Sequence, residues 1–380
     1  MKLLEAEIKH HFGVKKVFLV SSGKAALFII LRALKILAPG KNEVLIPAYT
    51  CFSVPSAVVR AGLKVVLCDI NPSTLDFDYG ILEKNINQNT LCIIPGHLFG
   101  IPSNIDEINR VCKKRGIFVV EDAAQAMGSA SGERLLGTLG DVGFFSLGRG
   151  KPISCGSGGI VVTNSDYIAK AIEEEFFKLR FPGMIANLKE FCKIIAMNIF
   201  IHPSLYWIPV GMPFLKLGET FFHKDFPVER LSSVQGGLCR GWKRRLKKST
   251  AGRIKKASML CRRLGSIKGT NDSGLTIPYL RLPVIVNNQD RKERICSLSY
   301  EKGLGIVRMY PTPINEIREI QHQFKGLTFP SAKFVAERLI TIPTHEFVGE
   351  KDYEKIIDLL AFEGPKAISD PFDFPVLCEA

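Results

Sequence analysis

The chain has 380 residues, which is enough for two domains at roughly 100–200 residues each. Apolar residues make up 46% of it, which excludes a disordered or low-complexity protein and leaves ample material for a large core. The net charge of +14 suits a partner that carries negative charge, such as a nucleotide, a nucleic acid or an anionic membrane, although a basic surface without such a partner explains it equally well.

The N-terminal residues 1–12 contain acids and histidines but no continuous apolar core, so we expect that they are not a secretory signal. The ten cysteines include no C-x-x-C pair, and Cys68 and Cys92 lie in apolar runs. This pattern favours reduced thiols in a cytoplasm over a disulfide framework, and we expect no metal site. The apolar stretch 194–215 is interrupted by His202 and three prolines, so we expect no membrane-spanning helix.

Short apolar strands alternate with helical patterns over the first 165 residues. Most of these strands are apolar on both faces, as expected when helices cover both sides of a sheet. Helices are predicted over Lys24–Leu37, Asn104–Arg115 and 166–179. This alternation predicts a mostly parallel sheet, whose ligands bind at the carboxyl ends of the strands. The predicted strands are Val17–Val20, Glu43–Pro47, Val65–Asp69, Leu91–Pro95, Ile117–Glu121, Val142–Leu147 and Gly159–Thr163.

The second half of the chain predicts a smaller α/β unit. We expect residues 183–228 to be irregular, because they are rich in aromatic residues and prolines. Leu231–Leu264 predicts one long basic helix or a bent pair, with Gly252 as its weak point. We therefore divide the chain into a large domain, 1–230, and a small C-terminal domain, 231–380. Further elements are expected at Leu282–Val286 and Gly305–Met309 as strands, and near Pro330–Leu339 and Lys351–Leu360 as helices.

A strand, a Ser-Ser-Gly turn and a helix follow one another between Val17 and Leu27. Free backbone N–H groups at the start of a helix attract phosphate, and Gly23 lets the backbone come close to the anion. The alternative is an ordinary strand–helix turn in which Ser22 caps the helix. The turn by itself leaves both interpretations open.

Asp122 and Gln125 follow directly from a buried strand, at its carboxyl end. A carboxylate there is well placed to hold a protonated heterocyclic nitrogen. The alternative is that Asp122 only caps the next turn or helix. The two interpretations have equal weight when this motif is considered alone.

A glycine-rich loop between two predicted strands carries Lys151, with Ser146 at its start. Desolvation among apolar strand ends lowers the pKa of a lysine and frees its amine for Schiff-base chemistry. Ser146 is placed to add a hydrogen bond to a phosphate. The alternative is a solvated lysine in a hairpin. Together, the three motifs provide what a pyridoxal phosphate enzyme needs: a phosphate cradle, a partner for the pyridine nitrogen and a Schiff-base lysine.

In this combination the sequence resembles the DegT/DnrJ/StrS family of pyridoxal-phosphate-dependent sugar aminotransferases, from about Val17 to Leu360. The resemblance implies a fold of type I, with a large, mostly parallel seven-stranded sheet domain and a smaller C-terminal α/β domain. The motifs that carry it are Ser22-Gly-Lys-Ala-Ala-Leu, Val44-Leu-Ile-Pro-Ala-Tyr-Thr, Pro95-Gly-His-Leu-Phe-Gly, Glu121-Asp-Ala-Ala-Gln, the stretch from Ser146 through Lys151 to Gly158-Gly159, Tyr310-Pro-Thr-Pro, Phe329-Pro-Ser-Ala and Ile342-Pro-Thr-His.

The resemblance also implies a role for each site residue. Lys151 is expected to hold pyridoxal 5'-phosphate as a Schiff base and to move the proton during transamination. Asp122 is expected to pair with the pyridine nitrogen, and Gln125 with the phenolic oxygen of the cofactor. The other expected cofactor contacts are Ser22, Gly23, Lys24 and Ser146 at the phosphate, and Tyr49 and Cys51 near the ring.

Four departures from the family's pattern concern the same site. Lys24 stands where the family usually has Thr, and a lysine still binds phosphate as a point charge. Cys51 stands where the family often stacks an aromatic ring on the cofactor. Val228 stands where a neighbouring subunit usually supplies an Asn, shortly before Arg230. The apolar, aromatic segment 191–214 has no counterpart.

We therefore expect a cytoplasmic homodimer that transfers an amino group from an amino acid, which the resemblance implies is glutamate, to a keto-sugar attached to a nucleotide. One alternative is a sugar dehydratase, although such relatives lack the Schiff-base lysine. Another is a non-catalytic regulator that binds nucleic acid or membrane through residues 240–263. That segment has no recognisable DNA-binding motif, so we expect no nucleic-acid partner. Together with 191–214 it resembles an interfacial anchor, which suggests peripheral contact with the inner membrane face or with a partner protein. The alternative, which we favour from the sequence, is that 191–214 covers the active site or fills the dimer interface.

Overall fold

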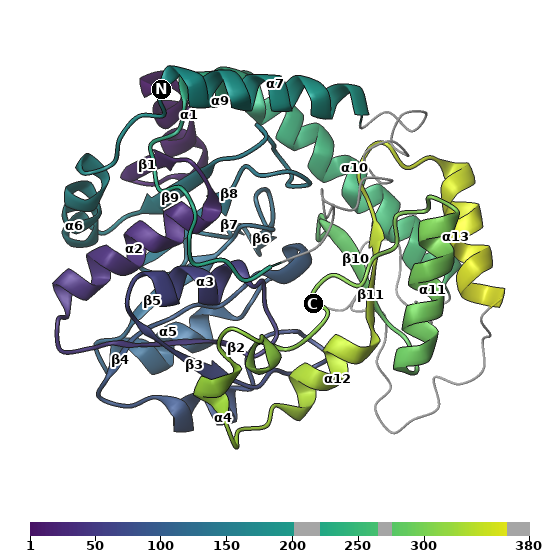
Figure 1. The fold of residues 1–380 in the computed structure, drawn as a ribbon, viewed down its shortest axis with the longest axis horizontal. Helices are drawn as coiled ribbons and strands as arrows, with labels where there is room; N and C mark the ends of the chain where they lie inside the picture. The colour runs from purple at the N-terminus through teal and green to yellow at the C-terminus, as the bar shows by residue number, and fades with distance from the viewer. Residues whose placement is uncertain (201–220, 265–275, 363–380) are drawn as a thin grey trace.

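The computed structural model describes residues 1–200, 221–264 and 276–362, and a seven-stranded sheet forms its centre (Figure 1). The strands run in the order β1-β9-β8-β5-β4-β2-β3, and only β9 is antiparallel to its neighbours. This confirms the predicted mostly parallel sheet. Every strand lies within two residues of its prediction: β1 (Lys16–Val20), β2 (Glu43–Pro47), β3 (Lys64–Cys68), β4 (Thr90–Ile93), β5 (Phe118–Asp122), β8 (Val142–Ser146) and β9 (Gly159–Thr163).

Helices cover both faces of this sheet because successive side chains of each strand point to opposite faces. Ile46 and Val120 belong to the apolar cluster that α2, α3 and α6 complete, whereas Leu45 and Val119 pack against α4 and α5. Leu19 packs with α1 in a third cluster. The helices are α1 (Lys2–Phe12), α2 (Gly23–Leu37), α3 (Ser53–Arg60), α4 (Tyr79–Asn85), α5 (Ile105–Lys113) and α6 (Asp166–Phe177).

A smaller α/β unit follows, at the right of Figure 1. Two antiparallel strands, β10 (Arg281–Ile285) and β11 (Leu339–Pro343), pair along their full length. They lie with α11 (Gln289–Glu301), α12 (Pro330–Arg338) and α13 (Glu350–Phe362). The division of the chain at residues 230 and 231 stays a prediction. Shorter elements are the hairpin β6 (Ala130–Ser131) and β7 (Arg134–Leu135), and the 3₁₀ turns η1 (Leu98–Gly100), η3 (Ile314–Glu316) and η4 (Gln321–Phe324).

The strand predicted at Gly305–Met309 is wrong. Only Val307 pairs there, in a single bridge with Thr341. Gly305 and Met309 both have positive φ angles, +76° and +56°, which are incompatible with continuous extended backbone. The segment Gly305–Met309 has the apolar alternation of a strand, but its backbone turns at both end residues.

One helical prediction is wrong in part, and another is confirmed with its bend at a different glycine. Part of the stretch expected to be irregular, 183–228, is the helix α7 (Met184–Phe200), and residues 201–214 of the apolar segment lie outside the described residues. The basic region forms the bent pair α9 (Ser233–Leu238) and α10 (Trp242–Arg263). The chain bends at Gly241, which has a φ of +71°, whereas Gly252 continues the helix. Within 1–200, 221–264 and 276–362, no helix is long and apolar enough to cross a membrane.

Candidate active site

The turn between β1 and α2 forms one wall of the site. Ser22 caps α2 by accepting a hydrogen bond from the Ala25 N–H at 3.1 Å, so the capping interpretation is correct. Capping leaves the first N–H groups of the helix directed outward, where an anion binds favourably. Glycines bring this turn close to two strands: a Cβ on Gly23 would lie 3.1 Å from Cβ of Ser146, and one on Gly159 would lie 2.2 Å from the Ser22 carbonyl oxygen.

Ser146 and Lys24 therefore lie beside the same turn. Ser146 ends β8 and its hydroxyl accepts a hydrogen bond from the Gly148 N–H at 3.2 Å. Burial lowers the pKa of the half-buried Lys24, the charge of Cys51 opposes this, and Arg60 lowers the pKa further. Arg60, on α3, was not predicted, because nothing in its sequence surroundings separates it from a solvated helix residue.

Asp122 is a buried carboxylate at the carboxyl end of β5. Its Oδ1 accepts a hydrogen bond from the Ala124 N–H at 3.0 Å, so it also stabilises the following turn. Burial raises the pKa of Asp122, and the Ala124 N–H, Lys151 and His97 oppose that rise. A cationic partner stabilises the charged form of a carboxylate in this position, because the attraction offsets the free energy of burying the carboxylate charge.

A second buried pair, His97 and Glu121, positions the strand end that carries Asp122. The two side chains are 2.9 Å apart, and the Ser103 N–H donates to Nδ1 of His97, so Nε2 carries the proton that Glu121 accepts. The His97 N–H in turn donates to the Asp122 carbonyl at 3.0 Å. Both residues stand in motifs that the sequence singled out, but their partnership depends on two neighbouring strands and was not predicted.

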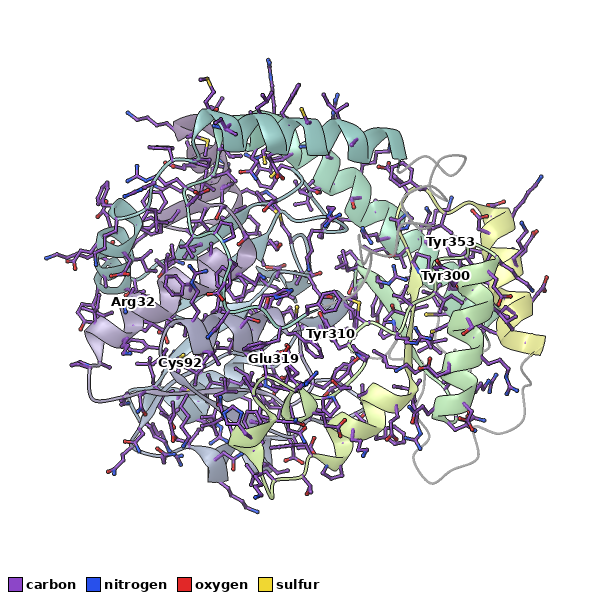
Figure 2. All side chains as sticks on the ribbon, viewed as in Figure 1. Arg32, Cys92, Tyr300, Tyr310, Glu319 and Tyr353 are labelled. Carbon is purple, nitrogen blue, oxygen red and sulfur yellow. The ribbon has the colours of Figure 1, made fainter. Side chains whose placement is uncertain are left out.

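Gln125 connects the large sheet to the second half of the chain. Its Nε2 donates to the hydroxyl of Tyr310 at 2.7 Å, and its Oε1 accepts from the Phe99 N–H at 3.1 Å. Figure 2 places Tyr310 near the middle of the molecule, between the large sheet and the smaller unit. The Ile314 N–H donates to the Ala48 carbonyl at 2.8 Å, which holds this segment against the end of β2.

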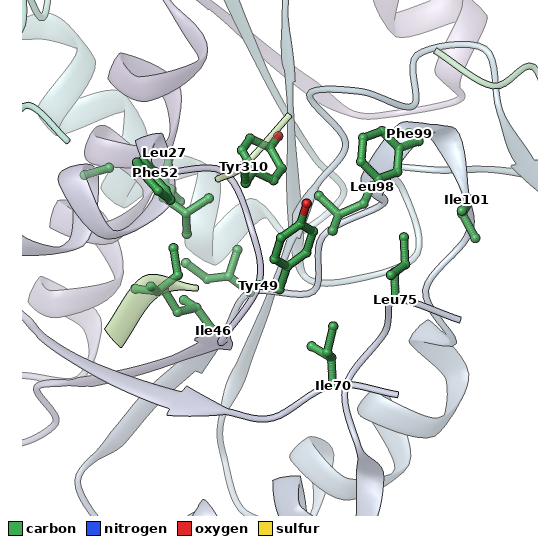
Figure 3. Packing of buried hydrophobic residues seen from close by; sticks show 14 of the residues in the cluster. Leu27, Ile46, Tyr49, Phe52, Ile70, Leu75, Leu98, Phe99, Ile101 and Tyr310 are labelled. Carbon is green, nitrogen blue, oxygen red and sulfur yellow. The ribbon is translucent and has the colours of Figure 1, made fainter. Parts of the chain in front are cut away.

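Tyr49 and Cys51 occupy different positions relative to this site. Tyr49 is fully buried in the apolar cluster of Figure 3, with its ring 5.6 Å from that of Tyr310. Cys51 is half-buried and lies within hydrogen-bonding reach of the Tyr310 hydroxyl. When ionised, its charge raises the pKa of both Lys24 and Lys151. Cys51 therefore faces the predicted cofactor site more directly than Tyr49 does.

Lys151 completes the set from the loop between β8 and β9. Burial lowers the pKa of its ammonium group, and the negative charges of Cys51 and Asp122 oppose that change. Its N–H donates to the Gly148 carbonyl at 3.3 Å, and Gly150 turns the chain beside it with a φ of +72°. The fold thus brings one amine, one buried carboxylate and one glycine-lined helix start to the same end of the sheet.

These groups fit a cofactor with a phosphate, a protonated ring nitrogen and an aldehyde. The start of α2, with Gly23 closely facing Ser146, suits the phosphate, and Lys24 adds a positive charge. The buried Asp122 suits the ring nitrogen, and Lys151, whose pKa burial lowers, suits the aldehyde.

A model of the DegT/DnrJ/EryC1/StrS aminotransferase family matches residues 1–361. The chain belongs to this family. Membership establishes pyridoxal phosphate as the cofactor and confirms the resemblance that the motifs indicated. It also agrees with the fold, because the match covers the large sheet, α7 and the smaller α/β unit alike.

Individual relatives agree with this assignment. GDP-perosamine synthase of Vibrio cholerae is 30% identical over 194 residues, 51% of this chain and 51% of that protein, so the chain spans about half the length of this relative. The spore coat polysaccharide biosynthesis protein SpsC of Bacillus subtilis is 25% identical over 93% of this chain and 87% of its own length. PseC of Helicobacter pylori, an aminotransferase involved in pseudoaminic acid biosynthesis, superposes with a TM-score of 0.74 over 95% of this chain and 90% of its own, at 18% identity.

Val228 lies beside the turn between β1 and α2. The segment around it runs along Ser21, whose N–H donates to the Glu229 carbonyl at 2.9 Å and whose hydroxyl donates to the Pro227 carbonyl at 3.3 Å. Val228 itself packs against the main apolar cluster. An apolar side chain has no donor for a phosphate, so Val228 itself cannot make such a hydrogen bond.

Proposed function

We propose that this protein transfers an amino group from an amino acid, glutamate in the first instance, to a nucleotide-linked keto-sugar for polysaccharide or amino-sugar biosynthesis. Family membership supports amino transfer, and relatives such as the perosamine synthase and SpsC support a sugar acceptor. The observation that carries the proposal is the half-buried Lys151, on the loop between β8 and β9, within electrostatic reach of the buried Asp122 at the end of β5.

Each site residue has a part in this proposal. Lys151 would hold the cofactor covalently through its amine; once the amine of the donor replaces it there, the freed lysine amine would move a proton between the reacting carbons. Asp122 keeps the ring nitrogen protonated, Gln125 holds the phenolic oxygen, and Tyr310 fixes the amide of Gln125. When bound, pyridoxal phosphate supplies an electron-withdrawing ring that stabilises negative charge on the substrate carbon. Ser22, Gly23, Lys24 and Ser146 bind the phosphate, with Tyr49 and Cys51 beside the ring.

Absorption spectroscopy tests the reaction directly. Purified protein should show the visible band of a lysine-bound cofactor, glutamate should remove that band, and 2-oxoglutarate should restore it, because the two half-reactions are reversible. A series of other amino acids under the same conditions identifies the donor. Protein that binds the cofactor with no visible band, or a band that every amino acid leaves unchanged, contradicts amino transfer.

The two alternatives predict different spectra. A dehydratase would need no covalent lysine, and the presence of Lys151 argues against it. A regulator that keeps only the fold would bind nucleic acid or membrane through residues 240–263 with no response to glutamate. Neither alternative explains why a lysine and a carboxylate are buried together.

We further propose that the enzyme is a cytoplasmic homodimer whose active site lies near the subunit boundary, with peripheral contact at the membrane. The proposal rests on the family, because Val228 removes one cross-subunit contact. Light scattering at assay concentration should give twice the chain mass of 42.2 kDa. Dilution below the dissociation constant should lower activity and mass together. A fully active species of 42.2 kDa excludes the dimer as the working form.

A further inference from the structure

The end of α6 and the length of α7 carry large apolar side chains that are exposed to solvent. Met184 is 86% exposed and Leu188 61%. Residues 184, 188, 191 and 195 are spaced by four, three and four, which places them on one helix face. Figure 1 shows α7 along the outer edge of the molecule, away from the sheet. We call this set the α7 ridge: Phe177, Phe181, Met184, Ile185, Leu188, Phe191 and Ile195.

A different side of α7 faces the body of the protein. Asn187 and Glu190 are half-buried, and the Asn187 side chain donates to the Pro182 carbonyl at 3.1 Å. The pKa of the buried Cys155 thiol is raised first by its hydrogen bond with Cys239 and then by burial, and the charge of Glu190 raises it further. Glu190 therefore lies close to the core, and this packing turns the ridge outward.

The first part of the ridge is anchored by a cation. The guanidinium of Arg230 lies 4.8 Å from the ring centre of Phe181 and 5.7 Å from that of Phe177. Phe181 nevertheless remains 64% exposed. The two rings are thus held in place at the surface, so the apolar area is presented by an ordered part of the structure.

The cationic corner where α9 meets α10 borders this surface. Figure 1 shows α9 and the start of α10 beside α7, and Arg245 of α10 and Glu190 of α7 both act electrostatically on the buried Cys155 thiol, the first lowering and the second raising its pKa. Between Leu231 and Leu264 the chain contains no acidic residue. The exposed cations of this corner, called the α10 corner, are Arg240, Lys243, Arg244 and Lys247.

We propose that the α7 ridge and the α10 corner form a docking surface for an anionic lipid bilayer. A helix of 17 residues with one exposed apolar face lies in the plane of the interface, with that face among the acyl chains and its cations at the lipid phosphates. A second copy of the chain explains the surface less well. A two-fold contact through the ridge draws the two α10 corners toward each other, where like charges repel, whereas anionic lipids neutralise them.

Sedimentation with vesicles tests the proposal on the full-length holoenzyme. Vesicles of equal parts phosphatidylcholine and phosphatidylglycerol should pull down the protein at moderate salt. Pure phosphatidylcholine vesicles should bind it at least about tenfold more weakly, and high salt should weaken binding to the anionic vesicles.

Two variants separate the apolar and the electrostatic contributions. Leu188→Ser with Phe191→Ser should weaken binding at least about tenfold, because both side chains lose their burial in the acyl region. Lys243→Gln with Arg244→Gln should weaken it roughly fivefold for each cation removed. The matched control is Tyr300→Ser with Lys302→Gln at the C-terminal end of the distant α11, where Tyr300 is 69% exposed; it should bind like the unaltered protein.

Absence of binding to anionic vesicles overturns the proposal. Equal vesicle binding by the ridge and control variants overturns it as well. A third contradicting result is that the ridge variant binds vesicles like the control but changes from a dimer to a monomer. The last result assigns the ridge to a contact between two copies. The cofactor's absorption band and the melting temperature verify that each variant is folded. The α10 corner variant leaves the apolar packing intact, so it decides the question if the ridge variant fails to fold.

Discussion

Replacing Lys151 by alanine is expected to abolish the covalent attachment of the cofactor and to lower turnover by several orders of magnitude. Lys151 is the described lysine whose amine is both partly buried and within the electrostatic reach of Asp122 and Cys51. Borohydride reduction followed by mass spectrometry should place the cofactor on Lys151 in the unaltered protein. The reduced variant should carry no label.

Lys24 provides the control for this experiment. Lys24→Ala removes a charge at the proposed phosphate site, so it should weaken cofactor affinity while the label still forms on Lys151 at saturating cofactor. Added cofactor alone should not restore activity to the variant Lys151→Ala, because alanine has no amine to attach the cofactor. Finding the label on any other lysine in the unaltered protein refutes the assignment and with it the proposed chemistry.

Replacing Asp122 by alanine is expected to leave the cofactor linkage on Lys151 intact while slowing turnover on the order of 100-fold or more. The reason is that the ring nitrogen loses the carboxylate that keeps it protonated, so the ring withdraws electrons less strongly. Single-turnover kinetics with the chosen amino donor measure the effect. An unchanged turnover number rules out this role for Asp122.

The same residue predicts a change in stability that needs no activity measurement. Burial raises the pKa of Asp122 in the folded, cofactor-free protein above the value of an exposed carboxyl. The folded state therefore binds the proton more tightly than the unfolded state, and stability declines as pH rises from the unfolded pKa through the folded one. Asp122→Asn removes this loss, because the amide oxygen still accepts from the Ala124 N–H and carries no charge.

Thermal melts of cofactor-free protein measure this change. Asp122→Asn should melt at a higher temperature than the unaltered protein at neutral pH, and the difference should vanish at acid pH. Asp106→Asn serves as the control with the opposite sign, because its hydrogen bond to Arg134 lowers the pKa of that exposed carboxyl. A lower melting temperature for Asp122→Asn at neutral pH shows that its charge is already compensated within the chain.

The strands of the large sheet were predictable because each is a short apolar run bounded by turn residues, and burial on both faces requires that pattern. The helix starts followed from capping residues such as Ser22 and Asn104. The stretch Gly305–Met309 shows the limit of such reasoning. Its alternation suits a strand, but positive φ angles at its ends depend on how the smaller unit packs against β11.

By itself, the sequence determined the order of the chemical groups: a glycine turn, a buried acid, then a lysine loop. The sequence also placed these groups at the carboxyl ends of strands. Local apolar patterns specify the strands, and the carboxyl ends of parallel strands lie at the same edge of the sheet. Only the tertiary structure decided which groups meet. The hydrogen bond of Gln125 to Tyr310, the pairing of His97 with Glu121 and the outward face of α7 each join or separate residues distant in the chain. Such contacts arise from the packing of whole elements, which no local pattern of residues encodes.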